Sequence, residues 1–513
     1  MSKQNKKTHL FGFGLICALM LLAGQNVFAA SQAYKRAEYS MNRGEYLQAA
    51  QRFYDITKNS QYKLEHPQAL YNLGRTLNKL NLNQAAINYL TVIAKLNRGP
   101  VDDALEVLYE LGFEIGDQES LVYALSKLNL KKFPKSKQDL LYYRIGEVYL
   151  EGKHYAKAAA SFARVPSSSK LYAKAQYSRG LAFAEQGNAK ASVISFTRAV
   201  NARKEKGITD TQRVGALMGR ARAYYQAGLW DQSISTYRMI PRDSYFWHDS
   251  IFESSWALLR SGRFRSALSN FQSLHSKFYD DKYQPESLIL RSIVYLYICR
   301  YDEVDKVLAS YDTTYGKMQS QINAYVSDRK AKTENLIQAN RMYEDLKVPG
   351  KTIRDSYNGI PGVALRYITK KAEFSRYYNY LLNLYAERER LRKQPANWLK
   401  SNLGQQITKY LNGRIENVET YLSKFVEDSL KLMAKELVEL NDQKEYIKYE
   451  VLNSKTELAR KELSGNDSEE SYVDQETSRN YYIQNGYEYW PFKGEYWLDE
   501  IGNYHYVGTS QCQ

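Results

Sequence analysis

Cysteine and histidine, the residues that most often build disulfide frameworks and metal sites, are scarce in this sequence. Its 513 residues include six histidines and three cysteines, Cys17, Cys299 and Cys512. No histidine stands at metal-ligand spacing with another histidine, a cysteine or a carboxylate, so we expect no metal and no other cofactor. A single bridge between Cys299 and Cys512 stays open. However, Cys299 falls within a predicted helix among apolar residues, which favours a buried thiol.

Sequence motifs of common catalytic sites are also missing. There is no Gly-x-Ser-x-Gly turn for a nucleophilic serine and no glycine-rich loop that could cradle a phosphate. The repeats described below leave few loops long enough to carry a catalytic site. We therefore expect a protein that is not an enzyme.

After residue 29 the sequence lacks an apolar run long enough to span a membrane, so we expect no transmembrane segment in the mature chain. Residues 1–29 form a typical secretory signal, with lysines near the start, an apolar run from Leu10 to Ala23 and a cleavage site at Val27-Phe28-Ala29. Ile16 before Cys17 is too bulky for a bacterial lipoprotein signal. These features predict export to the periplasm of a Gram-negative bacterium, with association with the outer membrane left open.

Charge is unevenly distributed along the chain. The net charge is +16, yet from Ser464 onward nine acidic residues face only Arg479 and Lys493, so the preceding body is strongly basic. A basic body favours an anionic partner. Because the chain is predicted to be exported and has no nucleic-acid-binding motif, we do not expect this partner to be a nucleic acid. An anionic envelope surface is one candidate, and a solvated surface without a partner is the alternative.

One pattern of small and large residues recurs eight times between residues 30 and 318. The repeats begin near Ala30, Pro67, Leu105, Asp139, Ala173, Val214, His248 and Pro285, with a base period of 34. The eighth position is always small: Ala37, Gly74, Gly112, Gly146, Gly180, Ala221, Ser255 and Ser292. The twentieth is small or modest, from Ala49 to Val304, and the twenty-fourth is large: Phe53, Leu90, Leu128, Phe162, Phe196, Tyr237, Phe271 and Leu308. Small side chains let two antiparallel helices cross closely, while the large one fills the space beside them.

These columns resemble the tetratricopeptide repeat, whose signature has small residues at positions eight and twenty and large ones at four, seven, eleven and twenty-four. The resemblance implies an all-α superhelix of about eight repeats over residues 30–318. It also implies that the first helix of each repeat lines a concave groove that binds proteins or peptides. The predicted groove residues are Tyr71, Arg75, Asn78, Lys79, Tyr109, Tyr143, Tyr177, Arg222, Tyr225, Phe252, Trp256 and Arg260.

Residues 319–463 predict a long helical hairpin instead of further repeats. A helix is expected over Tyr315–Leu346, followed by a turn-rich interruption from Lys347 to Gly362. Two long helical patterns follow, Val363–Arg392 and Trp398–Leu463, with a hinge between them. The second carries apolar residues at roughly helical intervals with charged residues between them, which is typical of a coiled-coil-like helix.

The chain ends in an acidic linker, residues 464–480, and an aromatic segment, residues 481–513. Glycines among the aromatic residues indicate turns or short strands, and such a composition favours packing over disorder. The segment either folds back on the protein's own helices or docks on another chain, with Trp490, Phe492, Tyr496 and Trp497 as anchors. Its Trp-Pro-Phe and Gly-Glu-Tyr-Trp stretches resemble, more loosely, the ends of exported tetratricopeptide repeat proteins of bacterial envelope and gliding-motility machineries.

Together these features predict an exported, non-enzymatic scaffold. We expect it to bind protein or peptide partners in a bacterial cell-envelope complex through the groove. The alternative is an envelope protein that binds peptidoglycan or another glycan through exposed aromatic rings and the basic surface.

Overall fold

The computed structural model describes residues 30–128, 138–202, 209–327, 334–348, 351, 353–464 and 496–506. Helices account for most of these residues, which confirms the predicted all-α fold. The predicted signal peptide, most of the acidic linker, Trp490, Phe492 and Cys512 lie outside the described residues.

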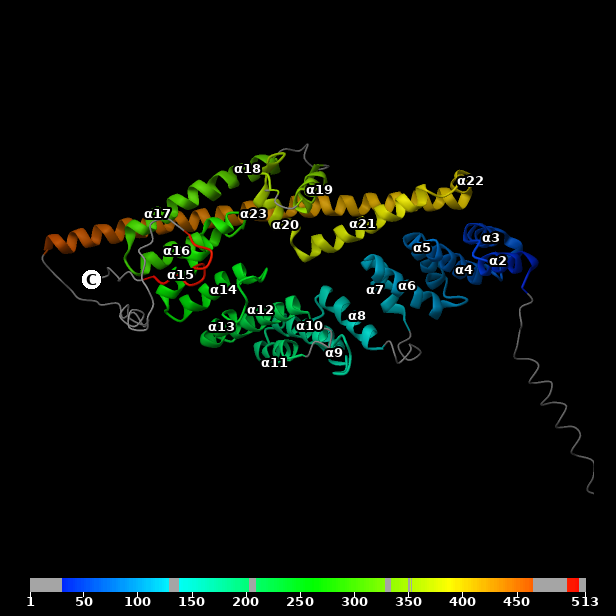
Figure 1. Cartoon of the computed structure of the whole chain (residues 1–513), viewed down its shortest axis with the longest axis horizontal. Coiled ribbons are helices and arrows are strands. Elements are labelled where there is room, and N and C mark those ends of the chain that lie inside the picture. Colours follow the sequence, from blue (N-terminus) through cyan, green and yellow to red (C-terminus); the bar gives the residue numbers. More distant parts are fainter. Residues whose placement is uncertain are drawn as a thin grey trace, which may run out of the picture. The chain divides into compact units, whose positions relative to one another are not determined.

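Eight consecutive helix pairs correspond to the eight predicted repeats (Figure 1). Within each pair the two helices pack against each other. The pairs are α2 (Gln32–Asn42) with α3 (Tyr46–Lys58), α4 (His66–Lys79) with α5 (Asn83–Leu96), α6 (Val101–Ile115) with α7 (Gln118–Lys127), α8 (Gln138–Glu151) with α9 (Tyr155–Ala163), α10 (Tyr172–Glu185) with α11 (Ala189–Val200), α12 (Asp210–Gln226) with α13 (Trp230–Tyr237), α14 (Trp247–Arg260) with α15 (Phe264–Leu274), and α16 (Pro285–Tyr297) with α17 (Tyr301–Tyr311). Short 3₁₀ turns, Ser60–Tyr62 and Lys277–Tyr279, follow α3 and α15.

The small and large columns have the packing role that the sequence predicts. A Cβ atom on Gly146 would lie 2.6 Å from the ring of Phe162, and one on Gly180 would lie 2.9 Å from the ring of Phe196. The small residue at position twenty also contacts position eight, since the Ser192 hydroxyl donates a hydrogen bond of 2.9 Å to the Gly180 carbonyl oxygen. Glycine at position eight therefore makes room for the buried ring at position twenty-four.

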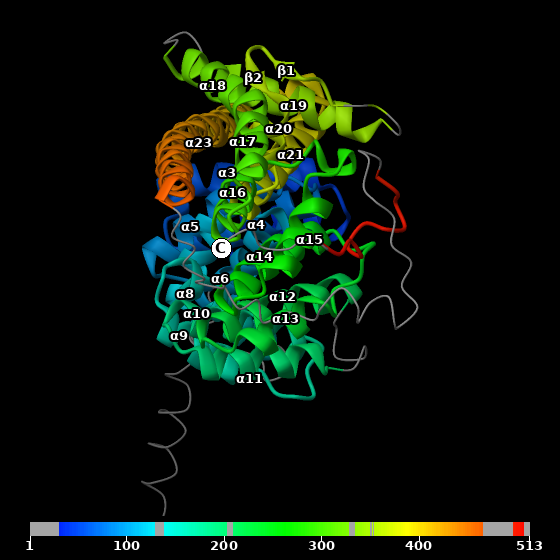
Figure 2. The ribbon, with the colours of Figure 1, turned by 90° about the vertical axis from the view of Figure 1, so that its left-hand side faces the viewer.

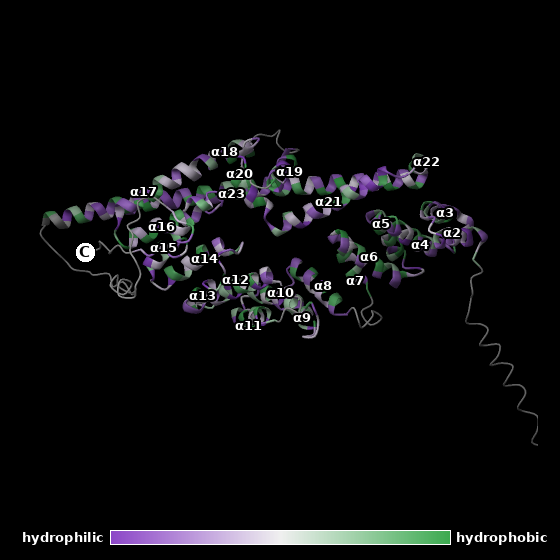
Figure 3. Cartoon of the chain, viewed as in Figure 1, coloured by the Kyte–Doolittle hydropathy of each residue, from purple (hydrophilic) through white to green (hydrophobic). Residues whose placement is uncertain are grey.

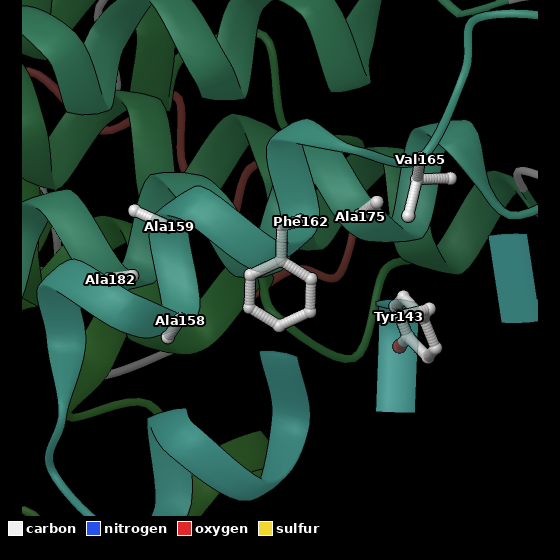
Figure 4. Packing of buried hydrophobic residues seen from close by; sticks show 7 residues of the cluster. All are labelled: Tyr143, Ala158, Ala159, Phe162, Val165, Ala175 and Ala182. Carbon is white, nitrogen blue, oxygen red and sulfur yellow. The ribbon is translucent and has the colours of Figure 1, made fainter. Parts of the chain in front are cut away.

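The core also continues from one repeat to the next. Phe162 of α9 is fully buried among residues of its own repeat and of α10 in the following repeat (Figure 4). This cluster contains Tyr143, Ala158, Ala159, Phe162, Val165, Ala175 and Ala182. Each repeat thus buries apolar surface that it could not bury alone, as in other repeat proteins.

The third repeat departs from the predicted register. Only two residues, Gly116 and Asp117, join α6 to α7, so the backbone of Leu121, not Ala124, approaches Gly112. Leu121 itself is buried, whereas Leu128, the expected large core residue, is only partly buried. The assignment of Leu128 to the core column is therefore wrong, because the short turn moves α7 along α6.

The chain divides into two compact units directly after this repeat. The first unit combines residues up to 128 with residues 380–415, and the second combines residues 129–379 with the chain from 416 onward. Both later divisions fall inside helices, α21 (Ala372–Arg392) and α23 (Asn402–Ser464). The units therefore do not follow the predicted domain boundary at residue 318.

In the first unit, polar contacts attach residues 380–415 to the three repeats. The carboxylate of Glu387, 1% exposed, accepts hydrogen bonds from the backbone N–H groups of Gln84 (2.8 Å) and Ala85 (3.1 Å) at the start of α5. Arg414 forms ion pairs with Asp117 (3.1 Å) and Glu119 (2.8 Å) at the start of α7. Negative charge at a helix N-terminus satisfies N–H groups that have no partner within the helix.

The segments after the last repeat differ in part from the predicted long helices. The π-turn Asp312–Gly316 leads into α18 (Lys317–Ser327), which is followed by α19 (Glu334–Lys347). A small antiparallel hairpin, β1 (Ser356–Tyr357) with β2 (Ile360–Pro361), occupies the predicted turn-rich interruption. The Asn358 and Gly359 φ angles of 50° and 86° suit its two-residue turn.

The predicted helix Val363–Arg392 is interrupted after Thr369 and forms two helices, α20 (Gly362–Thr369) and α21. The short helix α22 (Ala396–Leu399) occupies the predicted hinge before α23. α23 is the longest described helix (Figure 1), and Figure 2 views it nearly along its axis. Hydrophilic and hydrophobic residues are interspersed along it (Figure 3). In the second unit, Leu437 and Leu440 are buried, and Lys444 pairs with Asp312 after α17.

Cys299 does not have the predicted environment. It lies in the turn between α16 and α17 with a φ angle of 58°, is only partly buried, and is disulfide-bonded. The expectation of a buried helical thiol is therefore wrong. Cys512, with which a bridge was considered, lies outside the described residues.

Residues 496–506 of the aromatic segment pack on α14 and α15 and contain no helix (Figure 1, red). Ile501 is 2% exposed, and the backbone N–H groups of Gly502 and Tyr506 donate hydrogen bonds of 2.8 and 2.9 Å to the hydroxyls of Ser273 and Ser269. This part of the segment folds back on the protein's own repeats.

Candidate partner-binding site

The predicted groove residues belong to both units. Tyr71, Arg75, Asn78, Lys79 and Tyr109 lie on α4 and α6 of the first unit. The others lie on α8, α10, α12 and α14 of the second unit. We therefore describe the two sets separately.

Several of the predicted groove aromatics serve helix packing. Tyr109, Tyr143 and Phe252 are 2%, 8% and 9% exposed, which leaves little of each ring for a partner. The Tyr143 ring packs 5.7 Å from the ring of Phe162, and the Tyr177 ring packs 5.6 Å from that of Phe196, both centroid to centroid. Tyr143 and Tyr177 thus mainly pack against the large residue at position twenty-four of their own repeat.

Arg222 is occupied by a partner within the chain. Its guanidinium binds both carboxylate oxygens of Glu253 at 2.7 and 2.6 Å, and the Tyr237 hydroxyl donates to the same carboxylate at 2.9 Å. The hydrogen bonds that Arg222 donates to Glu253 raise the pKa of Arg222, and burial beside Glu253 raises the pKa of Tyr237. Sequence reasoning did not select Glu253, because it lies in the following repeat.

Other predicted groove cations are exposed and have no ion pair among the described residues. On α4, Arg75 lies over the Tyr71 ring at 5.6 Å, and Lys79 lies one turn further along, with Asn78 beside it. On α14, Arg260 is exposed one turn after the partly buried Trp256. Residues four apart share a helix face, so each helix carries a strip that combines an aromatic ring with positive charge. We call these the α4 strip (Tyr71, Arg75, Asn78, Lys79) and the α14 strip (Trp256, Arg260).

Tyr225, the remaining predicted residue, packs its ring 5.0 Å from that of Trp230 at the start of α13. It is partly buried. Its ring therefore stabilises the α12–α13 turn and contributes only its edge to the surface.

A cavity in the second unit was not predicted from the sequence. It has a volume of about 490 Å³ and lies between the start of α14, the segment before α16, α20 and α23. Its lining residues are Tyr245, His248, Asp249, Phe252, Asp281, Lys282, Tyr283, Gln284, Pro285, Glu286, Val363, Arg366, Tyr367, Lys370, Lys371 and Glu436. These residues come from segments far apart in the sequence, so no local motif could have indicated the site.

The cavity brings like charges close together. The ammonium groups of Lys282 and Lys370 lie 5.6 and 5.1 Å from the centroid of the same ring, that of Tyr245. Partial burial, Lys282 and Arg366 lower the pKa of Lys370 to about 8. Arg366 is paired with Asp281, whereas Lys282 and Lys370 have no carboxylate partner among the described residues.

Two glutamates line the same cavity. The Glu436 carboxylate accepts a hydrogen bond of 3.1 Å from the Tyr283 hydroxyl. Burial raises the pKa of both Glu286 and Glu436, and the charge of Glu436 raises that of Glu286 further. Within the described residues, no group of three or more histidine, cysteine or acidic side chains could hold a metal ion.

The family model of the tetratricopeptide repeat matches residues 142–207, which contain most of α8, all of α9–α11 and the Gly146–Phe162 and Gly180–Phe196 contacts. The chain contains tetratricopeptide repeats. A comparison with curated proteins found no match.

Three solved structures are similar to this one only loosely. One from Parabacteroides merdae is 13% identical, with coverage of 55% of this chain and 94% of its own and a TM-score of 0.26. The apo form of RapI is 13% identical, with 67% and 98% covered and a TM-score of 0.36. The TPR domain of P58(IPK) is 14% identical, with 75% and 98% covered and a TM-score of 0.18. TM-scores this low do not identify a fold. The assignment to the tetratricopeptide repeat therefore depends on the family model and the helix pairs.

Proposed function

We propose that this tetratricopeptide repeat protein is a scaffold that binds protein or peptide partners in a bacterial cell-envelope complex. Tetratricopeptide repeats generally serve protein–protein interaction and not catalysis. The observation that carries the proposal is the pair of strips on α4 and α14. Each presents exposed positive charge beside an aromatic ring, with no ion pair among the described residues to neutralise it.

The chemistry of these strips favours an acidic, extended peptide as the partner. Arginine binds carboxylates with two parallel hydrogen bonds, and aromatic rings supply apolar contact at interface centres. We expect Arg222 to contribute less to partner binding, because its guanidinium already donates to both carboxylate oxygens of Glu253.

A pull-down with the chain starting at Ala30, from extracts of its own cell, tests the strips. The double variants Arg75→Ala/Lys79→Ala and Trp256→Ala/Arg260→Ala should each lose partners that the unchanged chain recovers. The control is Lys190→Ala/Arg198→Ala, which removes two exposed cations from α11, a second helix. Unchanged recovery with both strip variants would remove the strips from the proposal.

Export to the periplasm, association with the outer membrane and a gliding-motility role are parts of the same proposal. The sequence of residues 1–29 supports export. No helix among the described residues is long and apolar enough to cross a membrane. Cell fractionation with detection of the mature N-terminus tests the location, and recovery in the cytosol with residues 1–29 intact would contradict it.

A second candidate is binding to peptidoglycan, another glycan or an anionic envelope surface. It is favoured by the net charge of +16 and by Tyr245 and Tyr367, which are 56% and 42% exposed beside the lysines of the cavity. Sedimentation with purified cell walls at low and high salt tests it. Glycan contacts through rings should persist at high salt, charge contacts should weaken, and no sedimentation at either salt would dismiss this candidate.

A further inference from the structure

The cavity in the second unit holds a basic and an acidic cluster whose members form no ion pair with other described residues, although the charge of Asp249 acts on Lys370 and that of Lys371 on Glu436. In the first cluster, Lys282 and Lys370 share the Tyr245 ring, and neither has a carboxylate partner among the described residues. The one nearby arginine, Arg366, is already paired with Asp281. Two ammonium groups at such close quarters repel each other, and an anion between them would relieve that repulsion.

The second cluster has the opposite sign. Glu286 is partly buried and has no ion pair among the described residues, and Glu436 accepts a hydrogen bond from Tyr283. The two carboxyl groups are close enough for the charge of Glu436 to raise the pKa of Glu286. A cation placed against them would favour the ionised form of both.

The shape of the cavity limits what could satisfy both clusters together. A sphere with the volume of the cavity, about 490 Å³, is roughly 10 Å across, and three extended residues span about 10 Å. A free amino acid, whose charges are separated by one carbon, would fill only a small part of this length. Phe252 and the exposed rings of Tyr245 and Tyr367 supply apolar walls for the chain between the charges.

We propose that this cavity binds a short zwitterionic peptide, with its carboxylate at Lys282 and Lys370 and its ammonium group at Glu286 and Glu436. No residue of the α4 or α14 strip lines this cavity, so it adds a ligand class that the scaffold role does not require. Like other small-ligand sites, it combines aromatic walls with a few charged groups that fix orientation.

Unblocked trialanine is the probe, because its only charges are one ammonium and one carboxylate about 10 Å apart. Isothermal titration of the chain starting at Ala30 should show trialanine binding at least about tenfold more tightly than N-acetyl-trialanine, which lacks the ammonium, and trialanine amide, which lacks the carboxylate. Equal binding of all three peptides would overturn the proposal, as would binding of none.

Two isosteric variants assign the ends of the peptide. Lys282→Gln/Lys370→Gln should abolish the preference for a free carboxylate, and Glu286→Gln/Glu436→Gln should abolish the preference for a free ammonium group. The control Lys190→Gln should change neither. Retention of both preferences in both variants would overturn the assignment. If a double variant fails to fold by circular dichroism, the single variants Lys370→Gln and Glu286→Gln make the same test.

Pull-down and titration have separate readouts. Loss of partners from the strip variants with no trialanine binding would remove the cavity site and keep the scaffold. Trialanine binding with unchanged partner recovery by the strip variants would keep the cavity site and remove the strips from the scaffold proposal.

Discussion

Replacement of Glu387 by alanine should release the start of α5 in the first unit. The change leaves the N–H groups of Gln84 and Ala85, which are 0% and 1% exposed, without the carboxylate that now accepts from them at 2.8 and 3.1 Å. Each buried donor left without a partner costs about 1–3 kcal/mol, so we expect a loss of about 2–6 kcal/mol. The largest part of this loss should be local to α5.

Hydrogen exchange followed by mass spectrometry measures that local loss directly. A loss of 2 kcal/mol corresponds to opening that is about thirtyfold more frequent, so the peptide at the start of α5 should exchange at least that much faster. The matched control is Glu389→Ala on the same helix, since Glu389 is exposed and pairs only with Arg392. Unchanged exchange at α5 in the Glu387 variant, or an equal increase in the control, would refute the reasoning.

The pH dependence of the same contact gives a second, signed result. Burial outweighs the backbone hydrogen bonds and raises the pKa of Glu387 from 4.5 to about 7. A carboxyl group whose pKa is raised on folding stabilises the folded state most below its unfolded pKa, and this stabilisation is lost as pH rises through the folded pKa. The advantage of wild type over Glu387→Ala should therefore shrink by about 3 kcal/mol between pH 4.5 and pH 8. An advantage that grows with pH would contradict this account.

Three further outcomes are expected. Gly146→Ala should lower stability by about 1–3 kcal/mol, because its methyl group would overlap the Phe162 ring, whereas Gly413→Ala, with open space around it, should raise stability by about 0.5–1 kcal/mol. Thermal melts of the two variants check this, and equal shifts would contradict the packing argument. Deletion of residues 496–513 should increase iodide quenching of Trp247, which Gly502 now approaches, and unchanged quenching would mean that the segment does not cover this ring. Reduction of the Cys299 disulfide, or Cys299→Ser, should speed proteolysis of the turn between α16 and α17, and an unchanged cleavage rate would show that the bond does not constrain this turn.

The repeat fold could be predicted from the sequence because its packing is local. Position eight contacts position twenty-four of the same repeat, only sixteen residues on, so Gly146 with Phe162 and Gly180 with Phe196 stand out as spaced columns. Where one turn is shorter, as between α6 and α7, the column continues in the sequence while the contact moves to Leu121. The shorter turn is present in the sequence, but a comparison of residues at fixed positions does not reveal its effect on the contact.

Most of the site could not be predicted, because its contacts join distant segments. Glu387 reaches α5 across 303 residues, and Lys282 meets Lys370 only once α20 packs beside the segment before α16. The pairing of Arg222 with Glu253 spans 31 residues and joins two repeats, so no motif within one repeat indicates it. The predicted groove residues do lie on the first helices of their repeats, and their role in binding a partner stays a prediction. Which of them are exposed depends on neighbours that only the fold reveals.

The way in which the repeats bind residues 496–506 determines which residues of this segment can be substituted. Its anchoring hydrogen bonds run from the backbone N–H groups of Gly502 and Tyr506 to serine hydroxyls, and Arg242 donates to the backbone oxygen of Asp499. Backbone groups are the same in every residue except proline. Side chains that point away, such as Trp497 at 60% exposure, can therefore be exchanged without loss of the anchor. The repeats thus display a short sequence whose outward-facing positions are free to vary, while Ile501 and Gly502 are constrained by burial and by contact with Trp247.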